Sequence, residues 1–247
     1  MTKNNDDHLQ FFLTAPQPCA YLKDRFERKI FGYLSDDKAT EYNSNLTKYG
    51  FRRSQNIIYR PVCEGCKACI SVRILVDHFK LTASMSRVMK KNAHRVGTVC
   101  PAKATSEQYS LFKDYINSRH VDGGMSNMSA LEYQMMVEES KTKTNIIEYR
   151  NQNTDNLIGR VSNEPLIAVA LTDIIDDGLS MVYSFYDTNE LNTSLGMFMI
   201  LDHIQRAKTL GLSYVYLGYW VEGSAKMNYK ARYQPQEHLT ENGWVLK

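Results

Sequence analysis

Three cysteines stand at C-x-x-C spacing in the segment C-E-G-C-K-A-C: Cys63, Cys66 and Cys69. A C-x-x-C turn brings two thiolates to one metal ion, and the second step of the motif offers a third sulfur. Cys19 in Q-P-C-A-Y-L is the candidate for a fourth ligand, because Pro18 gives that segment a rigid approach and no histidine lies close by in sequence. These cysteines predict a structural zinc site or an iron–sulfur cluster. The alternative is a set of ordinary reduced thiols.

A second chemical feature is an uneven distribution of charge. Residues 51–100 hold ten Lys and Arg against two acids, whereas residues 151–200 hold one basic residue against seven acids. Asymmetry of this size favours contact between the basic segment and a polyanion, with a solvated basic face as the alternative. The candidates for phosphate contact in this segment are Arg87, Lys90 and Lys91.

The composition limits the class of protein. The chain has 247 residues, of which 43% are hydrophobic and 23% charged, and these values are typical of globular proteins. No apolar run approaches the roughly 18 residues of a membrane-spanning helix. The first ten residues are polar and include acids, which does not fit a secretory signal. We therefore expect a soluble cytoplasmic protein without membrane contact, in which disulfides do not persist.

The elements that must position these residues are irregular in the first half of the chain. The spacing of apolar and turn-forming residues predicts a helix over 35–49, strands over 56–60 and 68–76 on either side of the cysteine loop, and a helix over 84–95. We expect residues 1–98 to form a basic N-terminal domain that carries the cysteine loop.

The second half, residues 99–247, has a more regular order. The sequences T-S-E-Q at 105–108 and S-A-L-E at 129–132 are capping boxes, and each predicts the start of a helix. The elements expected after them are strands at 145–150, 157–162, 165–172 and 179–186, a helix at 195–210, a strand at 212–220 and a short helix at 224–233. A strand meander followed by one β–α–β crossover predicts a mixed α/β fold of α+β character.

This order is similar to the GNAT acyltransferase fold, in which the strands before and after the long helix diverge around the acyl donor. The resemblance implies that the diverging strands are 180–186 and 214–220, and Gly218 fits a bulge or the close approach of a ligand. Acyltransferases that use coenzyme A have a glycine-rich turn at the head of the long helix. The segment T-S-L-G-M-F has one glycine and no basic residue there, which argues against coenzyme A as the donor.

Four longer stretches resemble the bacterial aspartate/glutamate leucyltransferases, which are relatives of the eukaryotic arginyl-tRNA–protein transferases. They are P-C-A-Y-L-K-D-R-F-E-R-K-I-F (18–31), G-F-R-R-S-Q-N-I-I-Y-R-P-V-C-E-G-C-K-A-C-I-S-V-R (50–73), S-L-G-M-F-M-I-L-D-H-I (194–204) and Y-V-Y-L-G-Y-W-V-E-G-S-A-K-M-N-Y-K-A-R-Y-Q-P-Q-E-H-L (214–239). The resemblance implies transfer of leucine from leucyl-tRNA to the α-amino group of proteins that begin with Asp or Glu. The product would be marked for degradation through the N-end rule pathway.

The implied reaction depends more on the positioning of the two reacting groups than on a cofactor. The donor is an activated ester, and an N-terminal amine with a pKa of about 7.7–8.0 is partly neutral near pH 7. Orientation of the two groups, with donors for the developing oxyanion, would supply most of the acceleration, so no cofactor is required for the chemistry. Glu222 is the candidate base or amine-orienting carboxylate, with an ordinary helix-start acid as the alternative. Tyr219 is grouped with it as a catalytic candidate.

Recognition of an acidic first side chain calls for a guanidinium or an ammonium group. The candidates beside the cysteine loop are Arg53, Arg60 and Arg73, and those after the last strand are Lys226, Lys230 and Arg232. Each of them could instead hold a tRNA phosphate. The candidates for stacking on the terminal adenine or lining the aminoacyl pocket are Tyr219, Trp220 and Tyr229, with a core position as the alternative.

Two rival functions fit part of the sequence. A non-catalytic RNA-binding protein with a zinc ribbon would explain the basic segment and the cysteines. It would assign no role to the half of the chain that contains the β–α–β crossover. A small-molecule acetyltransferase would explain that half and is disfavoured by the single glycine before the long helix.

Overall fold

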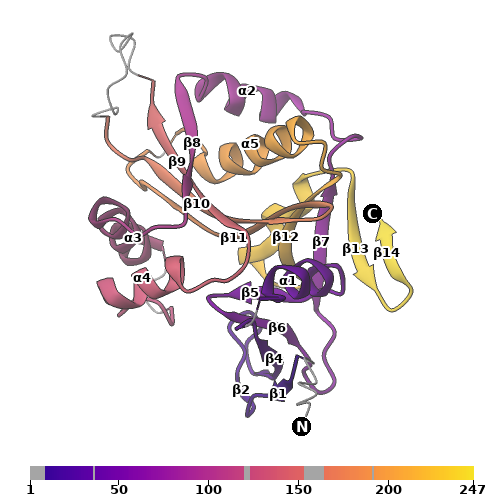
Figure 1. Cartoon of the computed structure of the whole chain (residues 1–247). Coiled ribbons are helices and arrows are strands. Elements are labelled where there is room, and N and C mark those ends of the chain that lie inside the picture. Colours follow the sequence, from indigo (N-terminus) through magenta and orange to yellow (C-terminus); the bar gives the residue numbers. More distant parts are fainter. Residues whose placement is uncertain (1–8, 36, 120–122, 153–163, 191) are drawn as a thin grey trace.

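An eight-stranded sheet lies at the centre of the computed structural model, which describes residues 9–35, 37–119, 123–152, 164–190 and 192–247 (Figure 1). Its strands, in spatial order, are β14 (Gly243–Leu246), β13 (Gln236–Thr240), β7 (Cys69–Leu75), β12 (Tyr214–Val221), β11 (Gly178–Tyr186), β10 (Ala168–Ile175), β9 (Thr144–Asn151) and β8 (Arg95–Pro101). The pair β11 and β12 is parallel, and the other neighbouring pairs of this sheet are antiparallel. This arrangement confirms the expected mixed α/β fold with one crossover.

A second, smaller sheet is formed by the N-terminal segment. Its strands, in spatial order, are β1 (Phe11–Leu13), β4 (Lys29–Tyr33), β6 (Ile57–Pro61) and β5 (Arg52–Ser54), and a separate pair joins β2 (Gln17–Pro18) to β3 (Phe26–Glu27). The sequence indicated only β6 in this region, because the residues of the other strands alternate weakly between buried and exposed positions.

The division of the chain differs from the expected boundary at residue 98. That boundary falls inside β8, and β7 from the first segment lies between β12 and β13 of the large sheet. The small sheet ends at Pro61. The cysteine loop therefore connects the two sheets, and residues 69–98 belong structurally with residues 99–247.

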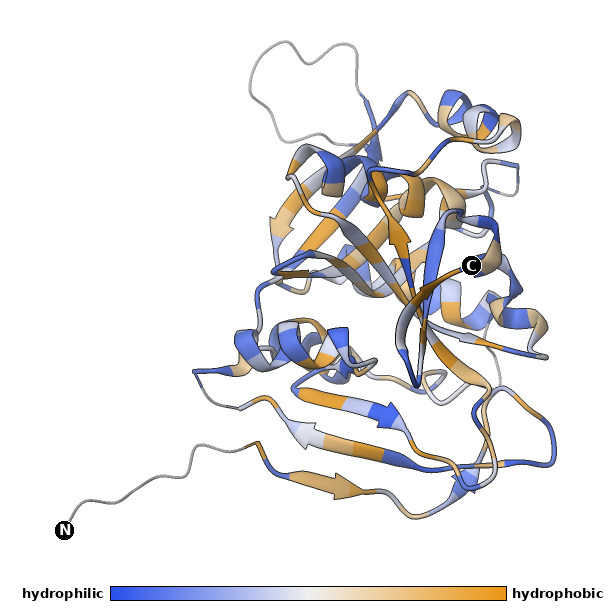
Figure 2. Ribbon diagram, turned by 90° about the vertical axis from the view of Figure 1, so that its right-hand side faces the viewer, coloured by the Kyte–Doolittle hydropathy of each residue, from blue (hydrophilic) through white to orange (hydrophobic). Residues whose placement is uncertain are grey.

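Helices cover both faces of the large sheet (Figure 1). On one face lie α2 (Ala83–Lys91) and α5 (Leu195–Thr209); on the other lie α3 (Ser106–Arg119), α4 (Ala130–Glu138), α1 (Ala39–Lys48) and the small sheet. A short 3-10 helix, η1 (Ala225–Arg232), follows β12. Each face has its own hydrophobic cluster, with Met199 of α5 in one and Phe112 of α3 in the other. The hydrophobic colours of Figure 2 accordingly run along the central strands.

Reciprocal side-chain caps mark the starts of α3 and α4. The capping box of α4 is present, since Ser129 Oγ accepts from Glu132 N and the Glu132 carboxylate accepts from Ser129 N. The same reciprocal pattern joins Thr105 and Gln108 before α3. The helix expected at 84–95 ends at Lys91, and Arg95 begins β8 instead.

Two further expectations differ in position or cannot be compared. The helix expected from residue 35 begins at Ala39, while Gly50 follows its end with φ of 81°, as a helix stop requires. The strand expected at 157–162 lies outside the described residues. In the parts of the chain that the structure describes, no helix is long and apolar enough to cross a membrane.

Candidate active site

The two parallel strands β11 and β12 separate soon after they meet. Their pairing comprises Gly178 with Tyr214, Leu179 with Val215 and Ser180 with Tyr216. Beyond these pairs β11 continues to Tyr186 and β12 to Val221 without pairing to one another. The divergence expected from the sequence is confirmed, and we refer to the space between residues 181–186 and 217–221 as the fork.

Backbone groups of β12 face the fork. Glu222 N donates to Ala68 O at 3.1 Å on the β7 side. Because hydrogen-bonded pairs alternate along an antiparallel ladder, residues 220 and 218 also bond to β7. The backbone N–H and C=O of Tyr219 therefore point away from β7, toward the fork. The Lys230 ammonium agrees with this direction, since its Nζ lies 2.5 Å from Tyr219 O.

The guanidinium of Arg52 reaches from β5 into the fork. Its Nη2 donates to Met181 O at 2.9 Å and to Val182 O at 3.2 Å, both on β11. On the β12 side it lies against Gly218, where an added Cβ would come within 2.5 Å of Arg52 Cζ. Gly218 also has φ of 73° at a bulge in the ladder, so glycine is required there for two reasons.

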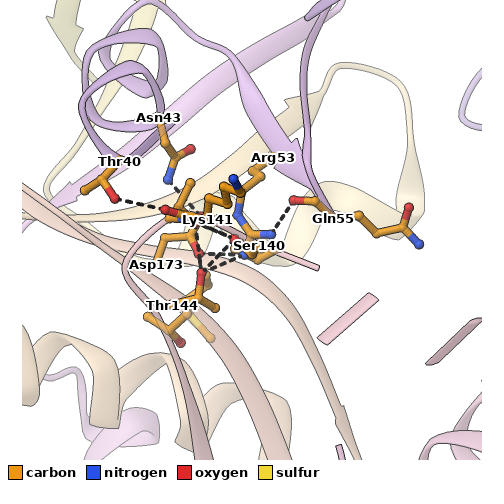
Figure 3. A network of polar contacts seen from close by, with 12 residues as sticks. Thr40, Asn43, Arg53, Gln55, Ser140, Lys141, Thr144 and Asp173 are labelled. Atoms are coloured by element: carbon orange, nitrogen blue, oxygen red, sulfur yellow. Dashed lines mark hydrogen bonds and ion pairs between the residues drawn. The ribbon is translucent and has the colours of Figure 1, made fainter. Parts of the chain in front are cut away.

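Arg52 is absent from the residues that the sequence singled out, and its neighbour Arg53 is present. Arg53 Nε and Nη2 each lie 2.6 Å from an Asp173 carboxylate oxygen, and Nη1 donates to Gln55 O (Figure 3). Asn43 of α1 donates to the same carboxylate. Arg53 is 5% exposed and Asp173 1% exposed. Arg53 is therefore fully occupied in joining the N-terminal segment to β10, and it is not available to a substrate.

Lys230 of η1 is the buried lysine of the fork. It is 5% exposed, and burial, together with the nearby positive charge of Arg52, lowers the pKa of its ammonium to about 7. Its hydrogen bond to Tyr219 O closes one side of the fork. Lys226, on the same short helix, is exposed.

The three aromatic candidates have different surroundings. Tyr219 is 7% exposed, and its hydroxyl donates to Gly50 O at 2.7 Å, so it is a core residue that packs on Tyr59. Trp220 packs on His238 with ring centroids 5.5 Å apart. Tyr229 is 44% exposed, and among the three candidates it has the ring most open to a ligand.

The remaining candidates lie outside the fork. Arg73 is enclosed by Tyr214 and Trp244, with its Cζ 3.6 and 4.2 Å from their ring centroids, and it pairs with Glu237 at 2.7 Å. Arg60 is exposed and donates to a backbone carbonyl of the N-terminal segment. Glu222 is exposed and lines a groove of about 510 Å³ whose basic residues are Lys23, Arg25 and Lys67.

The structure brings four of the cysteines to one small cavity of about 70 Å³; they are Cys19, Cys63, Cys66 and Cys69. All five cysteines of the chain are free thiols. The sulfurs of Cys19 and Cys63 each accept a backbone N–H at 3.5 Å. Burial and the three neighbouring thiols raise the pKa of Cys69 to about 12. Within the described ranges, no group of three or more His, Cys, Asp or Glu is arranged to hold a metal ion, so the metal site stays a prediction.

A larger groove lies at the head of α5, on the opposite face of the sheet from the small sheet. It has a volume of about 720 Å³, and its charged residues are Arg87 and Lys91 of α2 and Arg232 of η1. Ser194, which precedes α5, also lines it. We call it the basic groove. Two of the three expected phosphate contacts thus lie in one groove, while Lys90 is exposed on α2 outside its lining.

Comparison with known proteins defines the class to which the fold and site belong. The family model described as "Arginine-tRNA-protein transferase, N terminus" matches residues 17–87, and that described as "Arginine-tRNA-protein transferase, C terminus" matches residues 107–240. The chain belongs to the arginine-tRNA-protein transferase family.

Within that family, the chain is most informatively compared with two bacterial relatives. It is 56% identical over 244 residues to the aspartate/glutamate leucyltransferase of Brucella anthropi, covering 99% of this chain and 98% of the relative. It is 55% identical over 247 residues to the enzyme of the same name from Nitrobacter winogradskyi, covering 99% and 95%.

Solved structures with a similar fold are much more distant in sequence. The L-PGS protein of Bacillus licheniformis is 11% identical with a TM-score of 0.46, covering 72% of this chain and 50% of that one. FemX is 9% identical with a TM-score of 0.45, covering 81% and 65%. At these values the likeness carries no information about activity.

Proposed function

We propose that this protein is an aspartate/glutamate leucyltransferase, which moves leucine from leucyl-tRNA to the α-amino group of proteins that begin with Asp or Glu. Two relatives with that name are 55–56% identical over nearly the whole chain. The structural observation that supports the proposal best is the fork, because backbone groups of β12 face it and no strand among the described residues pairs with them there. The enzyme would act in the cytoplasm and feed the N-end rule pathway.

The donor would enter from the face that carries α2 and α5. The cations Arg87, Lys91 and Arg232 suit the phosphates at the 3′ end of a tRNA, because several cations along one groove neutralise a phosphate backbone. Lys90 would contribute from the rim. Tyr229 is exposed on η1, where it can stack on the terminal adenine.

The aminoacyl ester would then lie in the fork with its carbonyl oxygen toward the N–H of Tyr219. The acceptor amine, as free base, attacks the carbonyl carbon, and a C–N bond forms while the ester C–O bond breaks. The amine loses a proton, and the ribose hydroxyl of the tRNA leaves with one. A fixed backbone donor stabilises the oxyanion of the intermediate. Glu222 follows β12 but lies in the separate groove beside the cysteine loop, so it is not assigned to the reacting amine.

We also propose that Cys19, Cys63, Cys66 and Cys69 hold a structural zinc ion or an iron–sulfur cluster. Four convergent thiols form a soft donor set, and two of the sulfurs already accept backbone N–H groups. Burial, and after it the neighbouring thiols, raise the pKa of Cys69, and a bound cation would stabilise the thiolates against both effects. The group would stabilise the connection between the two sheets.

Metal analysis of anaerobically purified protein tests the cysteine proposal. About one zinc, or one coloured iron centre, is expected per chain, and Cys66→Ser should lose it. Cys100→Ser is the matched control, because Cys100 lies on β8 and does not line the cavity. Wild-type protein that is folded, active and free of metal would contradict the proposal.

A transfer assay tests the function itself. The protein is incubated with radiolabelled leucyl-tRNA and with peptides that begin with Asp, Glu or Asn, beside other charged tRNAs and acetyl-CoA. We expect kcat/KM for leucine transfer to be about 100-fold higher for the Asp and Glu peptides than for the Asn peptide. Binding of tRNA without any transfer would instead favour the zinc-ribbon RNA-binding alternative, and acetylation would favour the acetyltransferase alternative.

A further inference from the structure

Arg52 differs from the other sheltered arginines in its partners. Each other arginine that is not exposed, in the ranges that the structure describes, forms an ion pair with a carboxylate: Arg28, Arg53, Arg73, Arg95, Arg150 and Arg206. The hydrogen bonds of Arg52 go to the backbone carbonyls of Met181 and Val182, and none of its described contacts is to a carboxylate. Its Nη1 is buried and has no hydrogen-bond partner among the described residues.

Lys230 is a second basic residue of the fork that has no carboxylate partner among the described residues. It is buried in the fork with the carbonyl of Tyr219 as its partner, and it makes no ion pair with a described residue. A buried charge is normally paired, because the loss of hydration is otherwise uncompensated. Arg52 is charged, and Lys230, with a pKa lowered to about 7 by burial and by Arg52, is partly protonated near neutral pH. The positive charge of the fork and the unused guanidinium donor of Arg52 together fit an anion supplied by a substrate.

We infer that Arg52, supported by Lys230, binds the side-chain carboxylate of the acceptor protein's first residue. This inference rests on the proposed function and makes Arg52 the residue that selects Asp and Glu. The two cations lie where no carboxylate of the described chain neutralises them, so the acceptor's own carboxylate completes the ion pair. Charge-assisted hydrogen bonds from a guanidinium are stronger than those an amide would receive, so Asn and Gln are rejected.

The position of Arg52 favours the acceptor over the tRNA as the source of the anion. Arg52 comes from β5 of the small sheet, on the face opposite to α2 and α5 (Figure 1). The basic groove on the α2 and α5 face has its own exposed cations for phosphate. Arg52 also lies against Gly218, which directly precedes Tyr219, the proposed oxyanion donor. The carboxylate site and the reacting carbonyl are thus adjacent along β12.

The decisive measurement is the selectivity of Arg52→Met for the acceptor peptide. With saturating leucyl-tRNA, kcat/KM is measured for peptides that differ only in a first residue of Asp, Glu, Asn or Gln. We expect kcat/KM for the Asp and Glu peptides to fall about 100-fold, that for the Asn and Gln peptides to change less than threefold, and KM for leucyl-tRNA to stay constant. Lys208→Met, which removes an exposed cation from the far end of α5, is the control.

Two further variants keep the inference testable if Arg52→Met does not fold. Arg52→Lys retains the charge and should keep a preference for Asp over Asn while binding the Asp peptide more weakly. Lys230→Met should weaken binding of the Asp peptide about tenfold more than binding of the Asn peptide. Peptide affinity is also measured without tRNA, so that recognition is separated from chemistry.

An equal loss for acidic and amide peptides in these variants would overturn the inference, because Arg52 would then only hold the two strands apart. A wild-type protein that binds Asp and Asn peptides equally well would overturn it too. Absence of any transfer by the wild type would instead contradict the proposed function, while selective peptide binding lost in Arg52→Met would still support the carboxylate site.

Discussion

Arg52 and Arg53 are neighbours on β5, but their guanidinium groups lie in two regions of the molecule that differ in electrostatic character. Arg53 ends in a closed network where Asp173, Asn43 and Gln55 O surround it (Figure 3). Arg52 ends in the fork, where its described hydrogen bonds go to backbone carbonyls and a second cation, Lys230, lies close by. Because successive side chains of a strand point to opposite sides, the two adjacent arginines reach different environments.

The difference shows which charges the fold neutralises for itself. In the network around Arg53 the guanidinium and the Asp173 carboxylate neutralise each other without a ligand, and the network joins α1 and β5 to β10. The fork lacks a described carboxylate, and its charge is balanced only when a substrate anion arrives. Disruption of the first region should therefore lower stability, and disruption of the second should lower activity.

The largest effect is expected from Arg53→Met. It leaves Asp173, which is 1% exposed, without its guanidinium partner, and breaking a buried pair from one side costs about 3–5 kcal/mol. Urea denaturation should show a loss of unfolding free energy of that size. Arg60→Met, an exposed arginine of the adjacent strand, should change stability by less than about 0.5 kcal/mol. Similar small losses in both variants would remove the distinction between the two regions.

The second-largest effect is expected from Gly218→Val, and it is a loss of transfer activity. The new side chain would overlap Arg52, since even a Cβ lies 2.5 Å from its Cζ. Transfer to an Asp peptide should fall about 100-fold or more, which corresponds to at least about 2.7 kcal/mol of transition-state stabilisation. Gly211→Val is the matched control: Gly211 has φ of 69°, close to the 73° of Gly218, but no atom lies within 4 Å of its added Cβ. Equal losses would assign the effect to backbone strain.

The third prediction uses the titration of Lys230. Its pKa is about 7 in the folded protein and 10.5 as an ordinary lysine, so between these pH values the unfolded chain binds a proton that the folded chain does not. This group therefore makes the unfolding free energy rise with pH, by about 1.4 kcal/mol per pH unit inside that window. Urea denaturation at pH 7.5, 8.5 and 9.5 should show that Lys230→Met loses this contribution. Lys226→Met, exposed on the same short helix, should keep the wild-type slope.

The smallest effect is expected at the basic groove, where the charges are exposed. Replacing Arg87, Lys91 and Arg232 together with alanine should raise KM for leucyl-tRNA about tenfold and leave kcat unchanged. The slope of log affinity against log salt should become less steep by about 2, because each phosphate contact contributes about 0.7–0.9. Fluorescence titration with tRNA at several salt concentrations measures it. An unchanged slope would place the tRNA on another surface.

The fold was predictable where the sequence pattern is strong and local. Capping boxes at 105–108 and 129–132 mark the starts of α3 and α4, and the crossover through α5 predicted the parallel pair of β11 and β12. The divergence of that pair was implied by the resemblance to the GNAT fold. The small N-terminal sheet was missed, because strands as short as Phe11–Leu13, with all three residues exposed, show no alternation of buried and exposed positions. The boundary at residue 98 was displaced because β7 pairs with strands that are far away in sequence.

The site was predictable in composition but not in contacts. Cys19 was assigned to the cysteine loop across more than forty residues, and the structure brings its thiol to the same cavity. The choice between Arg52 and Arg53 failed because it depends on which face of β5 meets Asp173, a residue 120 positions away. The alternation of a strand indicates that the two arginines diverge, but only the tertiary structure shows which of them is neutralised.

The central place of β7 limits how this chain can be divided or recombined. The strand Cys69–Leu75 is contributed by the first third of the sequence and lies between β12 and β13, both near the end of the sequence. A fragment that starts after residue 98 would lack an interior strand of its own sheet. Chimaeras between relatives should therefore join the parents before Cys69, so that β7, β12 and β13 come from the same parent.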